Sequence, residues 1–213
     1  MSGLPVTFAR LATPSVAPLP ELARLPLPRV LLCDLDGTLI DSMPTLADLA
    51  TEVMESVYGT PRMLARELYL ATCGLPFVKQ LEEIYPGDPR NAGASDLFEG
   101  RKPARCDEIR MPVDTRRALE RLRAMGVRVA VSSNNGVANV ATFARNAAFT
   151  FDLVLGFGDG LAKGRPHIDA TSRRFGVDRQ EMLFVGDSLQ LSAPSGEVRM
   201  ITVDPWNGRA RIR

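Results

Sequence analysis

An apolar run that ends in two aspartates constrains this chain more than any other stretch of its sequence. Val30 to Cys33 is a short hydrophobic segment followed by a turn at Gly37, which is typical of a strand buried in a sheet. Asp34 and Asp36 come directly after it. Open α/β sheets place their chemistry at the carboxyl ends of strands, and two carboxylates there do nothing to stabilise a strand. The segment predicts a functional site, in preference to a turn with two capping aspartates.

Helices and apolar strands alternate in the second half of the chain. Strand patterns at 127–134, 151–158, 181–188 and 198–203 are separated by helical patterns, the first of which covers 115–126. Such alternation implies a parallel sheet with helices on its faces. We therefore predict an α/β fold, a Rossmann-like parallel sheet core with a small inserted α-helical cap domain. Residues 28–42 and 111–213 are predicted to form the core.

The insert between the two core segments has its own helical pattern. Residues 43–58 space apolar side chains three and four residues apart, as an amphipathic helix does, and further helices are predicted at 61–70 and 76–84. Residues 87–105 are polar and rich in Gly, Ala and Pro, so we predict a loop or lid margin there. Residues 43–110 are predicted to be a helical cap.

Composition excludes several classes of protein. The 26 basic residues are nearly balanced by 25 acidic ones, and a net charge of +1 gives no footprint for nucleic acid or an anionic membrane. The three cysteines form no CxxC pair, which favours a reducing compartment, and we expect a cytoplasmic protein. Residues 1–27 are predicted to be a proline-rich arm, neither a signal peptide nor a membrane span. No oligomeric state follows from the sequence.

The ends of the predicted strands carry the groups that chemistry on a phosphate needs. A carboxylate nucleophile needs a neighbouring acid for the leaving oxygen, and a phosphate dianion must be neutralised before an anion attacks it. A lysine and a metal ion supply that neutralisation, and Mg²⁺ prefers oxygen ligands such as carboxylates. The candidate residues are Asp34, Asp36, Ser132 with Ser133 as its alternative, Lys163 and Asp187.

These segments, in this order, closely resemble the haloacid dehalogenase-like superfamily of phosphohydrolases. The resemblance rests on DLDGT after an apolar strand, the serine after VAV, the lysine of AKGRP and the aspartate of VGDS. An insert just after the first motif is similar to the small cap of the phosphoglycolate phosphatase and β-phosphoglucomutase branch. The resemblance covers the whole predicted core.

The resemblance implies a role for each matched residue. Asp34 would be the nucleophile that forms an aspartyl-phosphate, and Asp36 the acid for the leaving group and then the base for water. Ser132 and Lys163 would bind the phosphate. Asp34, the main-chain carbonyl of Asp36, and Asp187 would hold Mg²⁺.

Four positions depart from the pattern of the superfamily. Gly164 replaces a usual proline, and His167 stands where an aspartate is common; we predict a helix N-terminal residue there with no catalytic role. Leu191 and Ser192 occupy the positions of a second metal-supporting acid, which predicts a weakened metal site unless a neighbouring polar side chain or water substitutes.

The cap offers candidates for reading the substrate. Four residues resemble the substrate-reading region of capped relatives, namely Thr72, Gly74, Leu75 and Lys79. Three basic residues either belong to a charged loop or face the cleft, where they would favour an anionic substrate tail: Arg101, Lys102 and Arg105.

The leading functional hypothesis is a Mg²⁺-dependent phosphatase acting on a small phosphorylated metabolite through an aspartyl-phosphate. Asp36 argues against dehalogenation, because a departing halide needs no proton. A phosphomutase, and a binding or regulatory protein whose chemistry has weakened, are the alternatives. The sequence does not select a substrate.

Overall fold

The computed structural model describes residues 26–186, 198–203 and 210–212. Residues 1–25 of the predicted arm lie outside this description. Within the described residues, no helix combines the length and the apolar character needed to cross a membrane.

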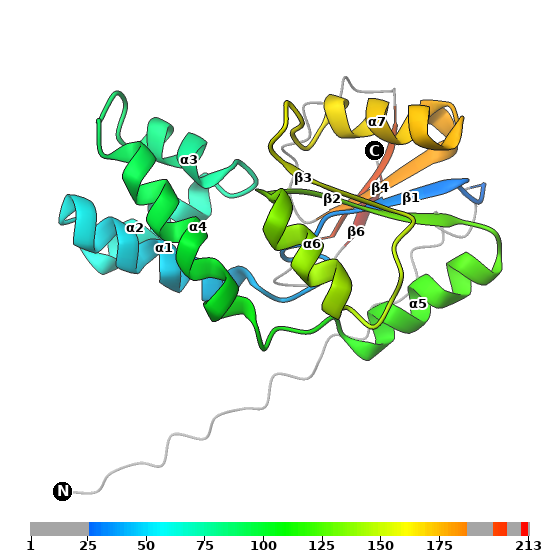
Figure 1. The fold of residues 1–213 in the computed structure, drawn as a ribbon, viewed down its shortest axis with the longest axis horizontal. Helices are drawn as coiled ribbons and strands as arrows, with labels where there is room; N and C mark the ends of the chain where they lie inside the picture. Colours follow the sequence, from blue (N-terminus) through cyan, green and yellow to red (C-terminus); the bar gives the residue numbers. More distant parts are fainter. Residues whose placement is uncertain (1–25, 187–197, 204–209, 213) are drawn as a thin grey trace, which may run out of the picture.

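Six strands form one sheet in the order β3-β2-β1-β4-β5-β6 (Figure 1). The first five are parallel, and β6 runs antiparallel to β5. The predicted α/β fold with a parallel sheet is confirmed, and β6 is an additional strand that the sequence pattern did not predict. The strands are β1 (Val30–Cys33), β2 (Arg128–Gly136), β3 (Leu153–Phe157), β4 (Met182–Gly186), β5 (Arg199–Val203) and β6 (Ala210–Ile212).

The central position of β1 explains its uninterrupted apolar sequence. Cys33 pairs with Val131 of β2 on one side and with Val185 of β4 on the other. All four residues of β1 are buried, because helices cover both faces of the sheet. The chain builds outward from β1 through β2 to β3 and then returns to the other side of β1 as β4, so the order of strands reverses there. Such a reversal opens a crevice at the carboxyl ends of the strands.

Alternate side chains of β1 pack against different helices. Leu31 and Cys33 share a hydrophobic cluster with Leu119 and Val140 on one face, and Leu32 shares another with buried residues on the opposite face. Figure 1 shows α5 and α6 below the sheet and α7 above it. Their bounds are α5 (Val113–Ala124), α6 (Val137–Asn146) and α7 (Arg165–Phe175), and a short 3-10 helix at Arg179–Glu181 precedes β4.

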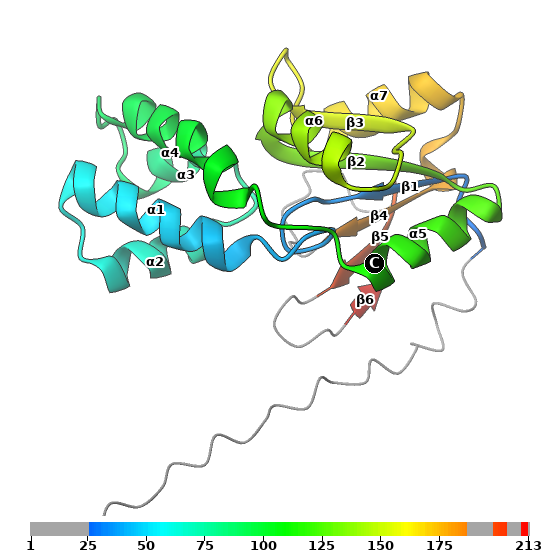
Figure 2. The ribbon, with the colours of Figure 1, turned by 60° about the horizontal axis from the view of Figure 1, so that its bottom comes forward.

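Four helices form a separate group beside the sheet (Figures 1 and 2). They have a hydrophobic cluster of their own, in which Phe77 stacks on Phe98 with ring centroids 4.1 Å apart. Stacked aromatic rings contribute beyond their buried area, so this pair joins the third and fourth helices firmly. The helices are α1 (Met43–Tyr58), α2 (Arg62–Ala71), α3 (Phe77–Ile84) and α4 (Asn91–Cys106).

The prediction of a loop at residues 87–105 is wrong, because α4 occupies most of that segment. Gly93, Gly100 and Pro103 lower its intrinsic helix propensity, and Pro103 lacks the N–H of a helical hydrogen bond. The helix is stabilised from outside by burial of Ala94 and Phe98 in the cluster of the four helices. Tertiary packing therefore overrides the local signal in this segment.

A close approach between β3 and α6 makes a glycine necessary at position 156. A Cβ on Gly156 would lie 2.7 Å from Val137 Cα and 2.9 Å from the Asn135 carbonyl oxygen, and backbone atoms cannot move aside cheaply. We expect Gly156→Ala to lower the free energy of unfolding by about 1–3 kcal/mol, measured by urea denaturation. Gly93→Ala is the matched control, since nothing lies within 4 Å of its added Cβ, and it should be neutral or slightly stabilising. Equal stability of the two variants would contradict this packing.

Candidate active site

Asp34 lies at the end of β1 with a cation directly against it. Its carboxylate accepts a hydrogen bond from Lys163 Nζ, and the two side chains are only 5% and 4% exposed. The other oxygen accepts the Leu35 amide at 2.8 Å. A buried carboxylate is tolerated where it is paired and hydrogen-bonded, so Lys163 offsets the cost of burying Asp34 at this position.

Asp36 is held by two donors from different parts of the chain. Ser42 Oγ donates to one carboxylate oxygen and Asn135 Nδ2 donates to the other. Burial raises the pKa of Asp36, against the opposing effects of the Lys102 and Lys163 charges and of the Ser42 hydrogen bond. A carboxyl group with a raised pKa retains its proton more readily, as a general acid must.

Asn134 connects the loop that carries Lys163 to the helical group. Its Oδ1 accepts the Lys163 amide at 3.0 Å, and its Nδ2 donates to the Gly74 carbonyl at 2.6 Å. Gly164, the residue after Lys163, has φ +112°, which a proline with φ fixed near −65° cannot adopt. This backbone conformation explains why the usual proline is replaced here.

Ser132 faces the helix α7 side of the sheet, where it meets His167. Ser132 Oγ lies 2.9 Å from His167 Nδ1, and His167 Nε2 lies 3.2 Å from the Gly156 carbonyl oxygen. A carbonyl only accepts, so Nε2 carries the hydrogen in the neutral ring and Nδ1 accepts the Ser132 proton. The neighbouring Ser133 hydroxyl accepts a hydrogen bond from the main-chain N–H of Asn135 at 3.0 Å.

A pocket lies between the strand ends and the helical group. Its floor is formed by Asp34, Asp36 and Lys163. The empty volume of the pocket, open solvent included, is about 520 Å³. Asn134 and Asn135 of β2 also line it. The helical group contributes Met43, Leu46, Tyr69, Cys73, Gly74, Leu75, Phe77, Gln80, Phe98, Glu99 and Lys102.

The predicted substrate-reading residues divide into two sets. Gly74 and Leu75 line the pocket, whereas Lys79 is exposed and the Thr72 hydroxyl is bound within the helical group to Gln80. Of the three basic residues of α4, Lys102 is buried and lines the pocket, while Arg105 pairs with Glu52.

The donor atoms at the pocket floor fit a hard cation such as Mg²⁺. Asp34 and Asp36 present oxygen atoms, the ligand type that Mg²⁺ prefers. β4 ends at Gly186, where an added Cβ would lie 3.4 Å from the Asp34 Cβ, so the end of β4 lies beside Asp34. Asp187, Leu191 and Ser192 lie outside the described residues. Within the described part, no group of three His, Cys, Asp or Glu side chains gathers.

Comparison with known proteins identifies the family of this chain. The sequence model of the haloacid dehalogenase-like hydrolases matches residues 28–197. The chain belongs to the haloacid dehalogenase-like hydrolases. It is 33% identical over 178 residues to a phosphoglycolate phosphatase of Nitrosospira multiformis, which covers 77% of each chain. The expected branch of the family is confirmed, and with it the expectation of a phosphatase.

Solved structures of the family share the fold of this haloacid dehalogenase-like enzyme. A predicted phosphatase from Clostridium acetobutylicum superposes with a TM-score of 0.70 at 19% identity, over 84% of this chain and 86% of the other. CbbY from Rhodobacter sphaeroides, solved in complex with phosphate, gives 0.59 at 22% identity, over 76% and 79%. At these identities the likeness concerns the fold.

The structure brings three of the predicted site residues together in the pocket, whereas the Ser132 hydroxyl is bound to His167. Asp34, Asp36 and Lys163 lie at one pocket floor. Sequence reasoning missed Ser42 and Asn135 as partners of Asp36, although both follow predicted site residues closely along the chain. It also missed the Glu99 and Lys102 pair, because that segment was predicted to be a loop.

His167 generates a prediction about pH and stability. Burial, assisted by the Lys163 charge, lowers its pKa to about 4 in the folded protein, against roughly 6.5 in an unfolded chain. Between these values the unfolded chain binds a proton that the folded chain does not. The free energy of unfolding should therefore fall as the pH drops from 6.5 to 4, by up to about 1.4 kcal/mol per pH unit.

The measurement is urea denaturation at several pH values for the wild type and His167→Gln, whose slope over this range should be smaller. Because the chain has one histidine, its imidazole proton resonance can be followed without ambiguity by NMR. A titration midpoint near 6.5 in the folded protein would contradict the buried, neutral ring.

Proposed function

We propose that this haloacid dehalogenase-like phosphatase hydrolyses a small phosphorylated metabolite through an aspartyl-phosphate on Asp34, with Mg²⁺ as its cofactor. The observation that carries the proposal is the buried Asp34 and Lys163 pair on the floor of a pocket, with Asp36 held two residues away by two hydrogen bonds. An anionic nucleophile, a countercharge for phosphate and an acid are the groups that phosphoryl transfer needs.

In the first step, an Asp34 carboxylate oxygen attacks phosphorus and the bond from phosphorus to the leaving oxygen breaks. The Asp36 carboxyl proton passes to the leaving oxygen, so the product departs as an alcohol. Lys163 offsets the negative charge shared by the nucleophile and the phosphoryl oxygens. The products of this step are the alcohol and phosphorylated Asp34.

In the second step, water attacks phosphorus and the bond between phosphorus and the Asp34 oxygen breaks. The Asp36 carboxylate accepts the proton of the water, which restores its acid form. Phosphate leaves and Asp34 returns as a carboxylate. The pocket position of Asp36 next to Asp34 suits both proton transfers.

When bound, Mg²⁺ would neutralise charge on the phosphate. Asp34, the main-chain carbonyl of Asp36, and Asp187 are the residues that would hold it. Leu191 and Ser192 carry no second acid, so water ligands, which Mg²⁺ commonly retains in protein sites, would complete its coordination.

Ser132 and Ser133 remain alternatives for the hydroxyl that binds phosphate. The Ser132 proton is directed at His167, whereas Ser133 acts as an acceptor for the Asn135 amide and can still donate its own proton. This favours Ser133.

The helices α1 to α4 support assignment of residues 43–110 as a cap that forms the second wall of the pocket. A pocket with a helical group as one wall favours a small phosphorylated metabolite, and the relative in Nitrosospira multiformis is a phosphoglycolate phosphatase. The cysteines are free, in keeping with a cytoplasmic enzyme.

Hydrolysis is preferred over a phosphomutase reaction. The single histidine lies in the core, bound to Ser132 and Gly156, so the cap has no histidine to serve as a catalytic group for such a reaction.

The nucleophile can be tested directly. Asp34→Asn should lower phosphate release from p-nitrophenyl phosphate by at least about 10³-fold, because a neutral amide is a poor nucleophile. Acid quenching of the wild type with a ³²P-labelled ester should trap label on the protein, and Asp34→Asn should trap none. Asp48→Asn, an exposed aspartate of α1, is the control and should behave as the wild type. Full activity in Asp34→Asn would exclude the covalent route.

Metal dependence is a separate prediction. Treatment with EDTA should abolish phosphate release, and millimolar Mg²⁺ should restore it, since phosphate charge must be neutralised before attack. Asp187→Ala should need more Mg²⁺ for half-maximal activity, and calorimetric titration with Mg²⁺ should show weaker binding. Metal-independent turnover by the wild type would remove Mg²⁺ from the proposal.

A further inference from the structure

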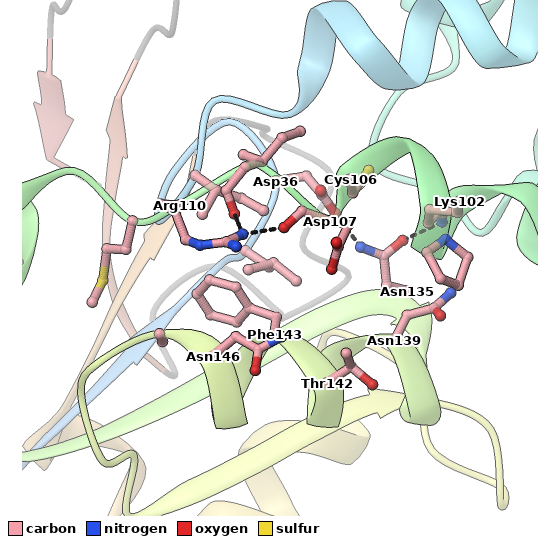
Figure 3. Close-up of a pocket in the computed structure, with 16 residues that line it drawn as sticks. Asp36, Lys102, Cys106, Asp107, Arg110, Asn135, Asn139, Thr142, Phe143 and Asn146 are labelled. Atoms are coloured by element: carbon pink, nitrogen blue, oxygen red, sulfur yellow. Dashed lines mark hydrogen bonds between the residues drawn. The ribbon is translucent and has the colours of Figure 1, made fainter.

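A buried lysine of the cap reaches the catalytic acid through one asparagine. Lys102 of α4 donates from Nζ to Asn135 Oδ1, and Asn135 Nδ2 donates to Asp36 (Figure 3). Lys102 is 5% exposed. The same three residues line the pocket described above and a second cavity, bounded by residues 106–111 and α6, so they form the wall between the two.

The chemistry of the three groups fixes their order. An ammonium group only donates, so the Asn135 oxygen must face Lys102, and its NH₂ group must then face Asp36. Without the lysine, the amide could turn over and present its oxygen to the Asp36 carboxylate. Lys102 therefore determines which end of Asn135 meets the acid.

Lys102 is itself held tightly. Its Nζ donates to Glu99 Oε1 at 2.9 Å and lies 4.7 Å from the centroid of the Phe98 ring. The second Glu99 oxygen accepts Asn139 Nδ2 at 3.0 Å, which ties the pair back to α6. With its charge offset by Glu99 and two of its three N–H donors bound to Glu99 and Asn135, Lys102 is better suited to holding a protein group than to capturing an anionic substrate tail.

We propose that Lys102 is a positioning residue for Asp36, acting through Asn135, so that a cap side chain fixes the acid of the core in its working orientation. The inference rests on the proposed function, in which Asp36 protonates the leaving oxygen. A general acid contributes about 10²–10⁴-fold, and a displacement of about 1 Å can cost 10²-fold. Loss of the link should therefore slow those reactions that depend on the acid.

The experiment compares two esters of similar shape, phenyl phosphate and p-nitrophenyl phosphate. Phenolate is about as basic as a tyrosine side chain, with a pKa of roughly 10, and needs a proton to leave, whereas nitrophenolate leaves readily without one. The ratio of kcat/KM for the two esters is the readout, because kcat/KM reports the steps up to transfer onto Asp34. It does not contain the later hydrolysis step.

Lys102→Met and Asn135→Asp should each lower kcat/KM for phenyl phosphate by about 10–100-fold, with a change below about threefold for p-nitrophenyl phosphate. Asn135→Asp is nearly isosteric and still accepts from Lys102, but it cannot donate to Asp36. Arg101→Met, which removes an exposed charge one residue away on α4, should leave the ratio unchanged. Thermal unfolding of each variant verifies that it is folded.

Equal losses for both esters, or a rise in KM alone, would overturn the inference, because a structural or substrate-binding role of Lys102 affects both esters alike. In that case the phosphatase proposal stands, since the wild type still turns over. Wild-type protein that hydrolyses neither ester in Mg²⁺ would overturn the proposed function, and this inference with it.

Discussion

A carboxylate buried at the end of the central strand is stable only because an ammonium group lies against it. Burial of one ion without a partner costs several kcal/mol, so the Asp34 and Lys163 pair must be formed together. Much of the surrounding structure serves this pair: β1 is centred in the sheet, Gly164 has a backbone conformation that proline cannot adopt, and Asn134 holds the Lys163 amide. The pair brings a carboxylate and its countercharge to the floor of the pocket.

A second set of contacts joins Asp36 to both parts of the molecule. Asp36 receives Ser42 from the segment that enters the cap and Asn135 from β2, and Asn135 in turn receives Lys102 from α4. His167 belongs to a different layer, behind the strand ends, where it accepts the Ser132 proton and donates to Gly156. The two layers divide the polar groups at the strand ends into those that face the pocket and those that hold the sheet to α7.

The sequence allowed prediction of the sheet and of the residues at the pocket floor because these depend on local signals. An apolar run followed by Asp34 and Asp36 predicts a buried strand with polar groups at its carboxyl end. Lys163 follows another apolar strand. The helix α4 was beyond such reasoning, because Gly93, Gly100 and Pro103 oppose it locally and only contacts such as Phe98 with Phe77 stabilise it. Lys102 and Glu99 became visible as a pair only once that segment was known to be helical.

The central strand is the first to be synthesised but among the last to be completed. β1 pairs with β2 and β4, whose pairing residues begin at Arg128 and Met182. Its apolar side chains therefore lack their strand neighbours until those later segments have been synthesised. Contacts of such large sequence separation form slowly and leave hydrophobic surface exposed to aggregation meanwhile. The cap has nearer contacts and a hydrophobic cluster of its own, so on the ribosome it can become compact while β1 still lacks neighbours. The order of the chain thus delays completion of the pocket floor until β4 has been synthesised, later than the cap and before β5 and β6.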